Sequence, residues 1–127
     1  MVLTGDVRVG TAGDFRIGLN EVAIGLPVPV LAMELARDRL SKRALTHATL
    51  NAQIYGPEDA LSAGYLDVVV PAGEVIARAK SEAARLGAYS KSAFKATKQR
   101  LRGATIAHVM ATMDADMRDL MIPTAPQ

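Results

Sequence analysis

Hydrophobic and polar residues alternate in two short stretches near the start of the chain. The stretches are Val7-Arg8-Val9 and Phe15-Arg16-Ile17. A period of two is typical of half-buried strands. The residues between them, 10–14, contain two glycines and predict a turn. Farther along, Pro27 and Pro29 impose an extended backbone on the residues before them.

The pattern becomes helical from Val30 onward, where leucines recur between charged positions. Ser41 is a suitable N-cap for a second helix that continues to about Asn51. Pro57 suits the first turn of another helix, and the glycine at position 64 is a matching end. Residues 66–70 then predict a short β-branched strand that Pro71 terminates.

Three further helices are expected in the last part of the chain. The first covers residues 74–86, the second runs from a Ser90 cap to Gly103, and the third starts at Thr105. The third has apolar residues at helical spacing, which predicts an amphipathic stripe. Its members are Ile106, Val109, Met110, Met113, Met117, Leu120 and Met121. Pro123 ends this helix, and a loose tail is expected over 123–127.

The amino-acid composition excludes several classes of protein. The 127 residues amount to one domain or a fragment of one, and 50% of them are hydrophobic. The absence of cysteine excludes a disulfide framework and thiolate chemistry. Two histidines without neighbouring carboxylates lack the spacing of a metal site. No apolar run reaches membrane-spanning length and the start has no secretory signal, so a cytoplasmic protein that binds no membrane is expected.

The net charge of +2 is small, and the most basic stretch covers residues 91–102. On a helix, Lys91, Lys95, Lys98 and Arg102 would share one face. This face is either simply solvated or a contact for an anion such as a nucleotide phosphate. Nucleic acid is disfavoured because the stretch has no series of aromatic residues for base stacking.

Two segments resemble the crotonase (enoyl-CoA hydratase/isomerase) superfamily. The first is Gly5-Asp6-Val7-Arg8-Val9-Gly10 followed by Gly13-Asp14-Phe15-Arg16-Ile17-Gly18-Leu19-Asn20-Glu21-Val22. The second is Tyr55-Gly56-Pro57-Glu58-Asp59-Ala60 followed by Ala63-Gly64-Tyr65-Leu66-Asp67 and Val69-Val70-Pro71. The likeness covers about residues 3–103 and implies an α/β, truncated crotonase-like fold. Residues 1–71 would then be the C-terminal part of the spiral core, and residues 72–122 a helical oligomerisation region.

The resemblance also implies a chemistry. Family members act on acyl-CoA thioesters, where two backbone N–H groups stabilise the enolate and glutamates move protons. By the same resemblance, both N–H donors and most of the CoA pocket would belong to a part of the domain that precedes Met1. Coenzyme A is part of the substrate, so no separate cofactor is expected, and a homo-oligomer, a trimer or hexamer, is implied.

Three residues are candidates for the site. Glu21 matches a catalytic glutamate of the hydratases and lies between apolar runs, although a solvent-facing carboxylate is the alternative. His47 stands where the resemblance expects a second glutamate; an imidazole can transfer protons, but a structural histidine is the alternative. Gly18 matches a position whose backbone approaches the thioester, although it can equally be a turn glycine.

The histidine at position 47 puts ordinary hydration in doubt, because hydration needs both a base and an acid. Isomerisation of a double bond can be run by one group that takes a proton and returns it. The sequence therefore indicates hydratase or isomerase chemistry on acyl-CoA, impaired in this chain. The rival hypothesis is a non-catalytic oligomerisation module derived from such an enzyme.

Overall fold

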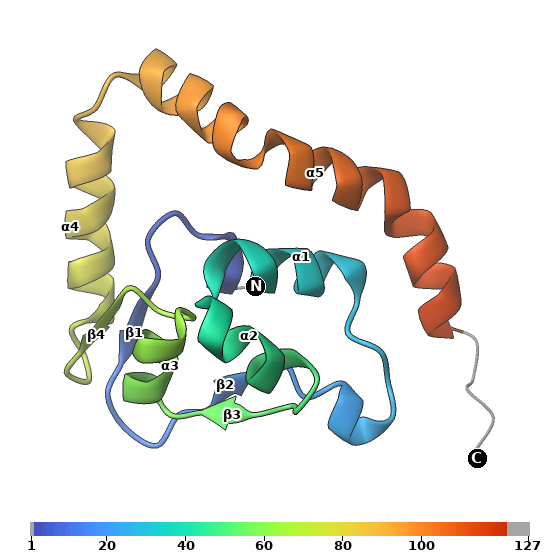
Figure 1. Ribbon diagram of the computed structural model, residues 1–127. Helices are drawn as coiled ribbons and strands as arrows, with labels where there is room; N and C mark the ends of the chain where they lie inside the picture. Colours follow the sequence, from blue (N-terminus) through green and yellow to red (C-terminus); the bar gives the residue numbers. More distant parts are fainter. Residues whose placement is uncertain (1, 122–127) are drawn as a thin grey trace.

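The computed structural model describes residues 2–121, and Figure 1 shows a small α/β body beneath a long helix. Its elements in order are η1 (Val2–Thr4), β1 (Val9–Thr11), β2 (Ile17–Gly18), η2 (Val22–Ile24), α1 (Val30–Arg39), α2 (Lys42–Thr49), β3 (Ile54–Tyr55), α3 (Pro57–Ala63), β4 (Val68–Val70), α4 (Val75–Gly87) and α5 (Lys91–Met121). The predicted order, short strands first and helices after, is confirmed.

The strands form two small sheets that join distant parts of the chain. Strand β1 pairs with β4 in parallel, with Val9 opposite Val68. Strand β2 pairs with β3 in the antiparallel sense, with Ile17 opposite Tyr55. The two early strands therefore do not pair with each other. Each pairs with a strand that follows a helix, and for the parallel pair β1–β4 such a crossover connection is required.

The core is built largely from small residues. Its buried members are Leu3, Ala36, Leu40, Ala48, Tyr55, Ala60, Ala63, Tyr65 and Leu66. Alanines on α1, α2 and α3 let these helices approach one another closely. The two tyrosine rings fill the largest part of the interior, with their centroids 5.5 Å apart. A chain with few aromatic residues thus places two of them at its centre.

The ends of the middle helices follow local sequence chemistry. The Ser41 hydroxyl accepts a hydrogen bond from the N–H of Ala44, as an N-cap does. Pro57 occupies the first turn of α3, and Gly64 ends that helix with a φ of 97°. A side chain at position 64 would place its Cβ 2.7 Å from the carbonyl oxygen of Arg39. Glycine is therefore required there both by backbone conformation and by space.

The prediction of two separate C-terminal helices is wrong. Helix α5 is continuous over 31 residues and passes through Gly103 without a break. A glycine weakens a helix interior but ends a helix only where the backbone turns left-handed, which Gly103 does not do. Tertiary contacts hold α5 along α1: the carboxylate of Asp116 accepts the N–H of Val30 at 2.9 Å. The expected tail, and residue 122, lie outside the described residues.

The basic face of α5 is partly used inside the molecule. Lys98 and Arg102 both contact the carboxylate of Asp6, at 2.6 and 3.0 Å. Lys91 and Lys95 are exposed. Two of the four predicted cations therefore tie α5 to the N-terminal segment instead of being left to bind a ligand. Between residues 2 and 121 no helix is both long and apolar enough to cross a membrane.

Candidate functional site

Glu21 lies at the start of the short 3₁₀ helix η2, directly after the β2 segment. Its carbonyl oxygen accepts the N–H groups of Ile24 and Leu26, which closes a tight turn around it. The side chain is half-buried, and its Oε2 atom is buried without a hydrogen-bond partner among residues 2–121. The Oε2 atom of Glu21 therefore does not face the solvent, contrary to the alternative that the sequence left open. A buried carboxylate oxygen with no partner is available to a ligand or a proton.

Two tyrosines belong to the surroundings of this carboxylate. The Tyr65 side chain is buried, and burial, followed by the proximity of Tyr55 and Glu21, raises the pKa of its hydroxyl to about 12. Burial also raises the pKa of Tyr55. Neither hydroxyl has a hydrogen-bond partner in the described part of the chain. Both groups therefore stay protonated at neutral pH and can only act as neutral donors or acceptors.

Gly18 serves the packing of the second sheet. A Cβ at this position would lie 2.6 Å from the Ile54 side chain and 2.9 Å from the carbonyl oxygen of Gln53. The missing side chain thus lets strand β3 approach β2 closely. This is a structural reason for glycine, and the substrate-binding role of its backbone stays a prediction.

His47 lies in the last turn of α2 and is exposed. Its Nδ1 is 3.1 Å from the side-chain nitrogen of Asn51, one helical turn away. Its carbonyl oxygen accepts the N–H of Gln53, which leads the chain from α2 into β3. His47 therefore has a clear structural role as well as an accessible ring.

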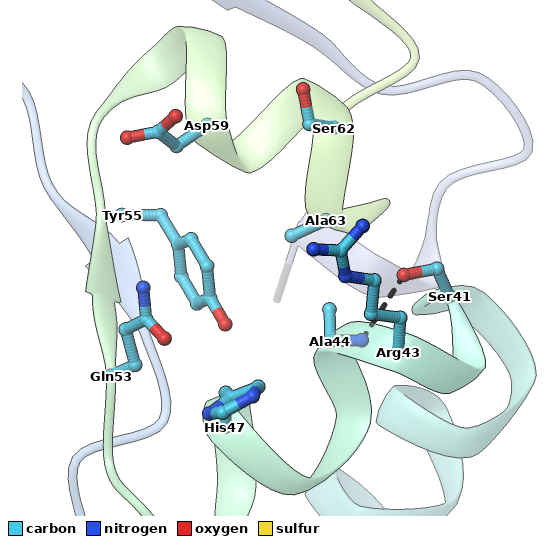
Figure 2. A pocket seen from close by; sticks show the side chains of 9 residues that line it. All are labelled: Ser41, Arg43, Ala44, His47, Gln53, Tyr55, Asp59, Ser62 and Ala63. Atoms are coloured by element: carbon cyan, nitrogen blue, oxygen red, sulfur yellow. Dashed lines mark hydrogen bonds between the residues drawn. The ribbon is translucent and has the colours of Figure 1, made fainter.

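A cavity of about 440 Å³ lies between α2, β3 and α3, and His47 is part of its wall. Figure 2 shows its lining residues, which are Ser41, Arg43, Ala44, His47, Gln53, Tyr55, Asp59, Ser62 and Ala63. Glu21 and Gly18 do not line this cavity. The structure thus brings Glu21 close to Tyr65 and places His47 in the wall of a cavity that Tyr55 also lines.

Of the two candidates for proton transfer, Glu21 therefore has a buried oxygen and His47 is exposed. Sequence comparison shows which family this arrangement belongs to. A profile of the family described as enoyl-CoA hydratase/isomerase matches residues 1–124. The chain belongs to the enoyl-CoA hydratase/isomerase family. The resemblance that the two sequence segments indicated is confirmed, and so is the crotonase-like fold.

Members of the enoyl-CoA hydratase/isomerase family similar to this chain include hydratases and isomerases. The human protein "Enoyl-CoA delta isomerase 1, mitochondrial" is 30% identical over 122 residues, which is 95% of this chain and 40% of the human protein. An enoyl-CoA hydratase/isomerase family protein from Pseudomonas syringae superposes with a TM-score of 0.88 at 39% identity, covering 94% of this chain and 52% of that one. Human mitochondrial delta3-delta2-enoyl-CoA isomerase gives a TM-score of 0.86 at 30% identity, with coverages of 93% and 46%. The chain thus spans about half the length of these enoyl-CoA hydratase/isomerase relatives, or less.

Inspection of the sequence missed the tyrosine pair and the cavity. Tyr55 and Tyr65 are two of only five aromatic residues, and they lie next to the glycines that bound α3, Gly56 at its start and Gly64 at its end. Scarcity of aromatics was the available signal that they fill the core. The contact between the two tyrosine rings depends on how strands and helices pack. No local pattern in the sequence of this enoyl-CoA hydratase/isomerase family member predicts that packing.

Proposed function

We propose that this chain carries the proton-transfer part of an acyl-CoA double-bond isomerase site, with Glu21 as the single catalytic base. The observation that carries the proposal is the buried Oε2 of Glu21, which lacks a partner within residues 2–121. Named isomerases among the relatives support this choice. Glu21 is not part of the cavity wall that His47 lines, which favours isomerisation by one group over hydration, since hydration needs a second group near the first.

In the proposed reaction, the Glu21 carboxylate takes a proton from C2 of a 3-enoyl thioester. The C2–H electron pair forms a C1–C2 double bond while the C1–O π electrons move to the thioester oxygen, which gives a dienolate. The C1–O double bond then re-forms, the C1–C2 π electrons move to C2–C3, and the C3–C4 π electrons form the C4–H bond with the proton that Glu21 returns. The net change is the position of one double bond. No water is added and no redox partner is needed, so one carboxylate suffices. The thioester oxygen holds negative charge between the two proton transfers.

Backbone N–H groups that stabilise that charge are the largest catalytic contribution in such reactions. By the family resemblance, these donors come from the first half of the domain, which the chain as printed does not match. Fatty-acid or related acyl-CoA thioesters are the proposed substrates, with coenzyme A as part of the substrate, and a cytoplasmic location is proposed with them.

The test is isomerisation of a 3-enoyl-CoA, followed by the absorbance of the conjugated 2-enoyl product. It uses this chain beside a version extended upstream by the first half of a relative's domain. The variant Glu21→Gln keeps the shape of the side chain but cannot carry the proton, so we expect it to lower kcat by at least about a hundredfold. His47→Ala is the matched control and should cost much less. Turnover unchanged in Glu21→Gln would place the chemistry at another residue.

A second candidate function is an oligomerisation module without catalysis. One face of α5 supports it: Ile106, Met110, Met113, Met117 and Met121 are all exposed. The neighbouring face, with Arg102, Val109 and Asp116, is the one that is less exposed and turns to the body. An uncovered apolar stripe of this length favours assembly, for which we propose a trimer or hexamer. Light scattering that shows a clean monomer at high micromolar concentration would contradict this proposal.

A further inference from the structure

The cavity between α2, β3 and α3 contains a buried hydroxyl that the isomerase proposal does not use. Tyr55 is only 6% exposed, and its hydroxyl oxygen has no hydrogen-bond partner in the described part of the chain. In Figure 2 this hydroxyl points into the cavity, toward His47 and Ala44. Burying a hydroxyl without a partner is unfavourable, and native proteins usually avoid it. The position of this hydroxyl therefore indicates a ligand that accepts its proton in a hydrogen bond.

Other donors in the cavity wall converge on the same space. Arg43 and His47 lie four residues apart on α2 and so share one face of that helix. The salt bridges found within residues 2–121 do not include Arg43, so its guanidinium is available. The Asn51 amide nitrogen faces Nδ1 of His47, and an amide nitrogen only donates. Nδ1 of His47 therefore accepts this hydrogen bond, and Nε2 carries a proton, which makes it a further donor.

The N-terminal end of α2 also borders the cavity, at Ser41, Arg43 and Ala44. The positive end of the helix dipole adds to the charge of Arg43. Asp59 is the one carboxylate in the wall; it lies in the first turn of α3, where a negative charge stabilises that helix. The cavity wall thus contains one cation, several hydrogen-bond donors and a single acidic group, Asp59, which also stabilises α3.

We propose that this cavity binds a small oxyanion, a carboxylate or a phosphate group, through Arg43, His47 and the Tyr55 hydroxyl. Arg43 supplies the charge and a forked pair of N–H donors, which match the oxygens of either group. Tyr55 and His47 supply neutral donors from a second direction. This site is distinct from Glu21, which does not line the cavity, and it does not depend on the proposed isomerase activity.

The experiment is an NMR titration of the full chain with inorganic phosphate and, separately, with acetate. The shifts of the His47 ring and of the Ala44 and Tyr55 signals are followed at constant ionic strength. We expect saturable shifts at these residues, and the tighter of the two anions identifies the preferred group. Absence of shifts at tens of millimolar of both anions would overturn the proposal.

Four variants separate a built site from general attraction of anions to a basic protein. Arg43→Gln should raise Kd by at least about tenfold, because it removes a charge-assisted hydrogen bond. Tyr55→Phe should raise Kd several-fold while the chain stays folded, and Asp59→Asn should lower Kd because it removes a repulsive charge. The control is Lys80→Gln, an exposed cation on α4 outside the cavity wall. A loss of binding in Lys80→Gln equal to that in Arg43→Gln would refute a specific site.

Discussion

The contact between Arg8 and Asp67 offers a sharp test of how the parallel strand pair is held. Arg8 directly precedes β1, and Asp67 directly precedes β4. Arg8 donates from Nε and Nη2 to the two carboxylate oxygens of Asp67, at 2.8 and 2.6 Å, and from Nη1 to the Gly64 carbonyl at 2.6 Å. Its backbone N–H donates to the same carboxylate at 2.8 Å. The Arg8 guanidinium thus joins the two strands and the end of α3.

The proposed change is Asp67→Asn, which removes the charge and keeps the shape. The Arg8 side chain is 7% exposed and that of Asp67 is 37% exposed, so the change leaves a buried guanidinium without its counter-charge. Removing one member of a fully buried ion pair costs about 3–5 kcal/mol. Water reaches Asp67, and asparagine retains one acceptor oxygen, so we expect a loss of about 2–3 kcal/mol in the free energy of unfolding.

The assay is urea denaturation followed by far-UV circular dichroism, at pH 7 and at pH 3. The hydrogen bonds from Arg8 hold the pKa of Asp67 below its usual range. A carboxyl whose pKa is lower in the folded state stabilises that state above the unfolded pKa of about 4. This contribution is lost as the pH falls through the folded pKa. The difference between the parent and Asp67→Asn should therefore be full at pH 7 and smaller at pH 3.

A matched control is Glu82→Gln on α4, whose carboxylate pairs with Arg78 and Arg85 along one helix. This group is on the helix surface, where ion pairs contribute little, so the denaturation midpoint should stay unchanged. If Asp67→Asn and Glu82→Gln behave alike at pH 7, or if the Asp67→Asn difference does not change with pH, the reasoning is wrong.

Two further predictions concern glycines. Gly64→Ala should destabilise the fold by about 2–3 kcal/mol, because the left-handed backbone and the carbonyl of Arg39 both resist a Cβ. Gly56→Ala is its control: the φ of –72° is ordinary and the space is open, so a thermal melt should show little change. Gly103→Ala should stabilise α5 by about 0.5–1 kcal/mol, since only the flexible end of Gln99 lies close to the new methyl group. A lower melting temperature for Gly103→Ala would mean that a break in α5 is required.

Features set by neighbouring residues could be predicted from the sequence. The cap at Ser41, the start of α3 at Pro57 and its end at Gly64 all depend on hydrogen bonds or backbone angles within a few residues. The period of two detected both early strands but misplaced them: β1 begins at Val9 and continues to Thr11, within the predicted turn, and β2 covers Ile17–Gly18. Family membership could be predicted as well, since it follows from two segments whose spacing is visible in the sequence.

Other features depend on contacts between distant residues, and only the tertiary structure decided them. Whether Gly103 ends a helix depended on Asp116 and Arg102 binding the body of the protein, not on the propensity of glycine. The sequence pattern likewise gave no indication that His47 would line a cavity with Tyr55. The apolar runs on both sides of Glu21 indicated burial, but not that its neighbour would be Tyr65. These positions follow from pairing β2 with β3 and packing α3 against β3 and α2. The energy of such contacts depends on which surfaces meet, and local periodicity does not encode this.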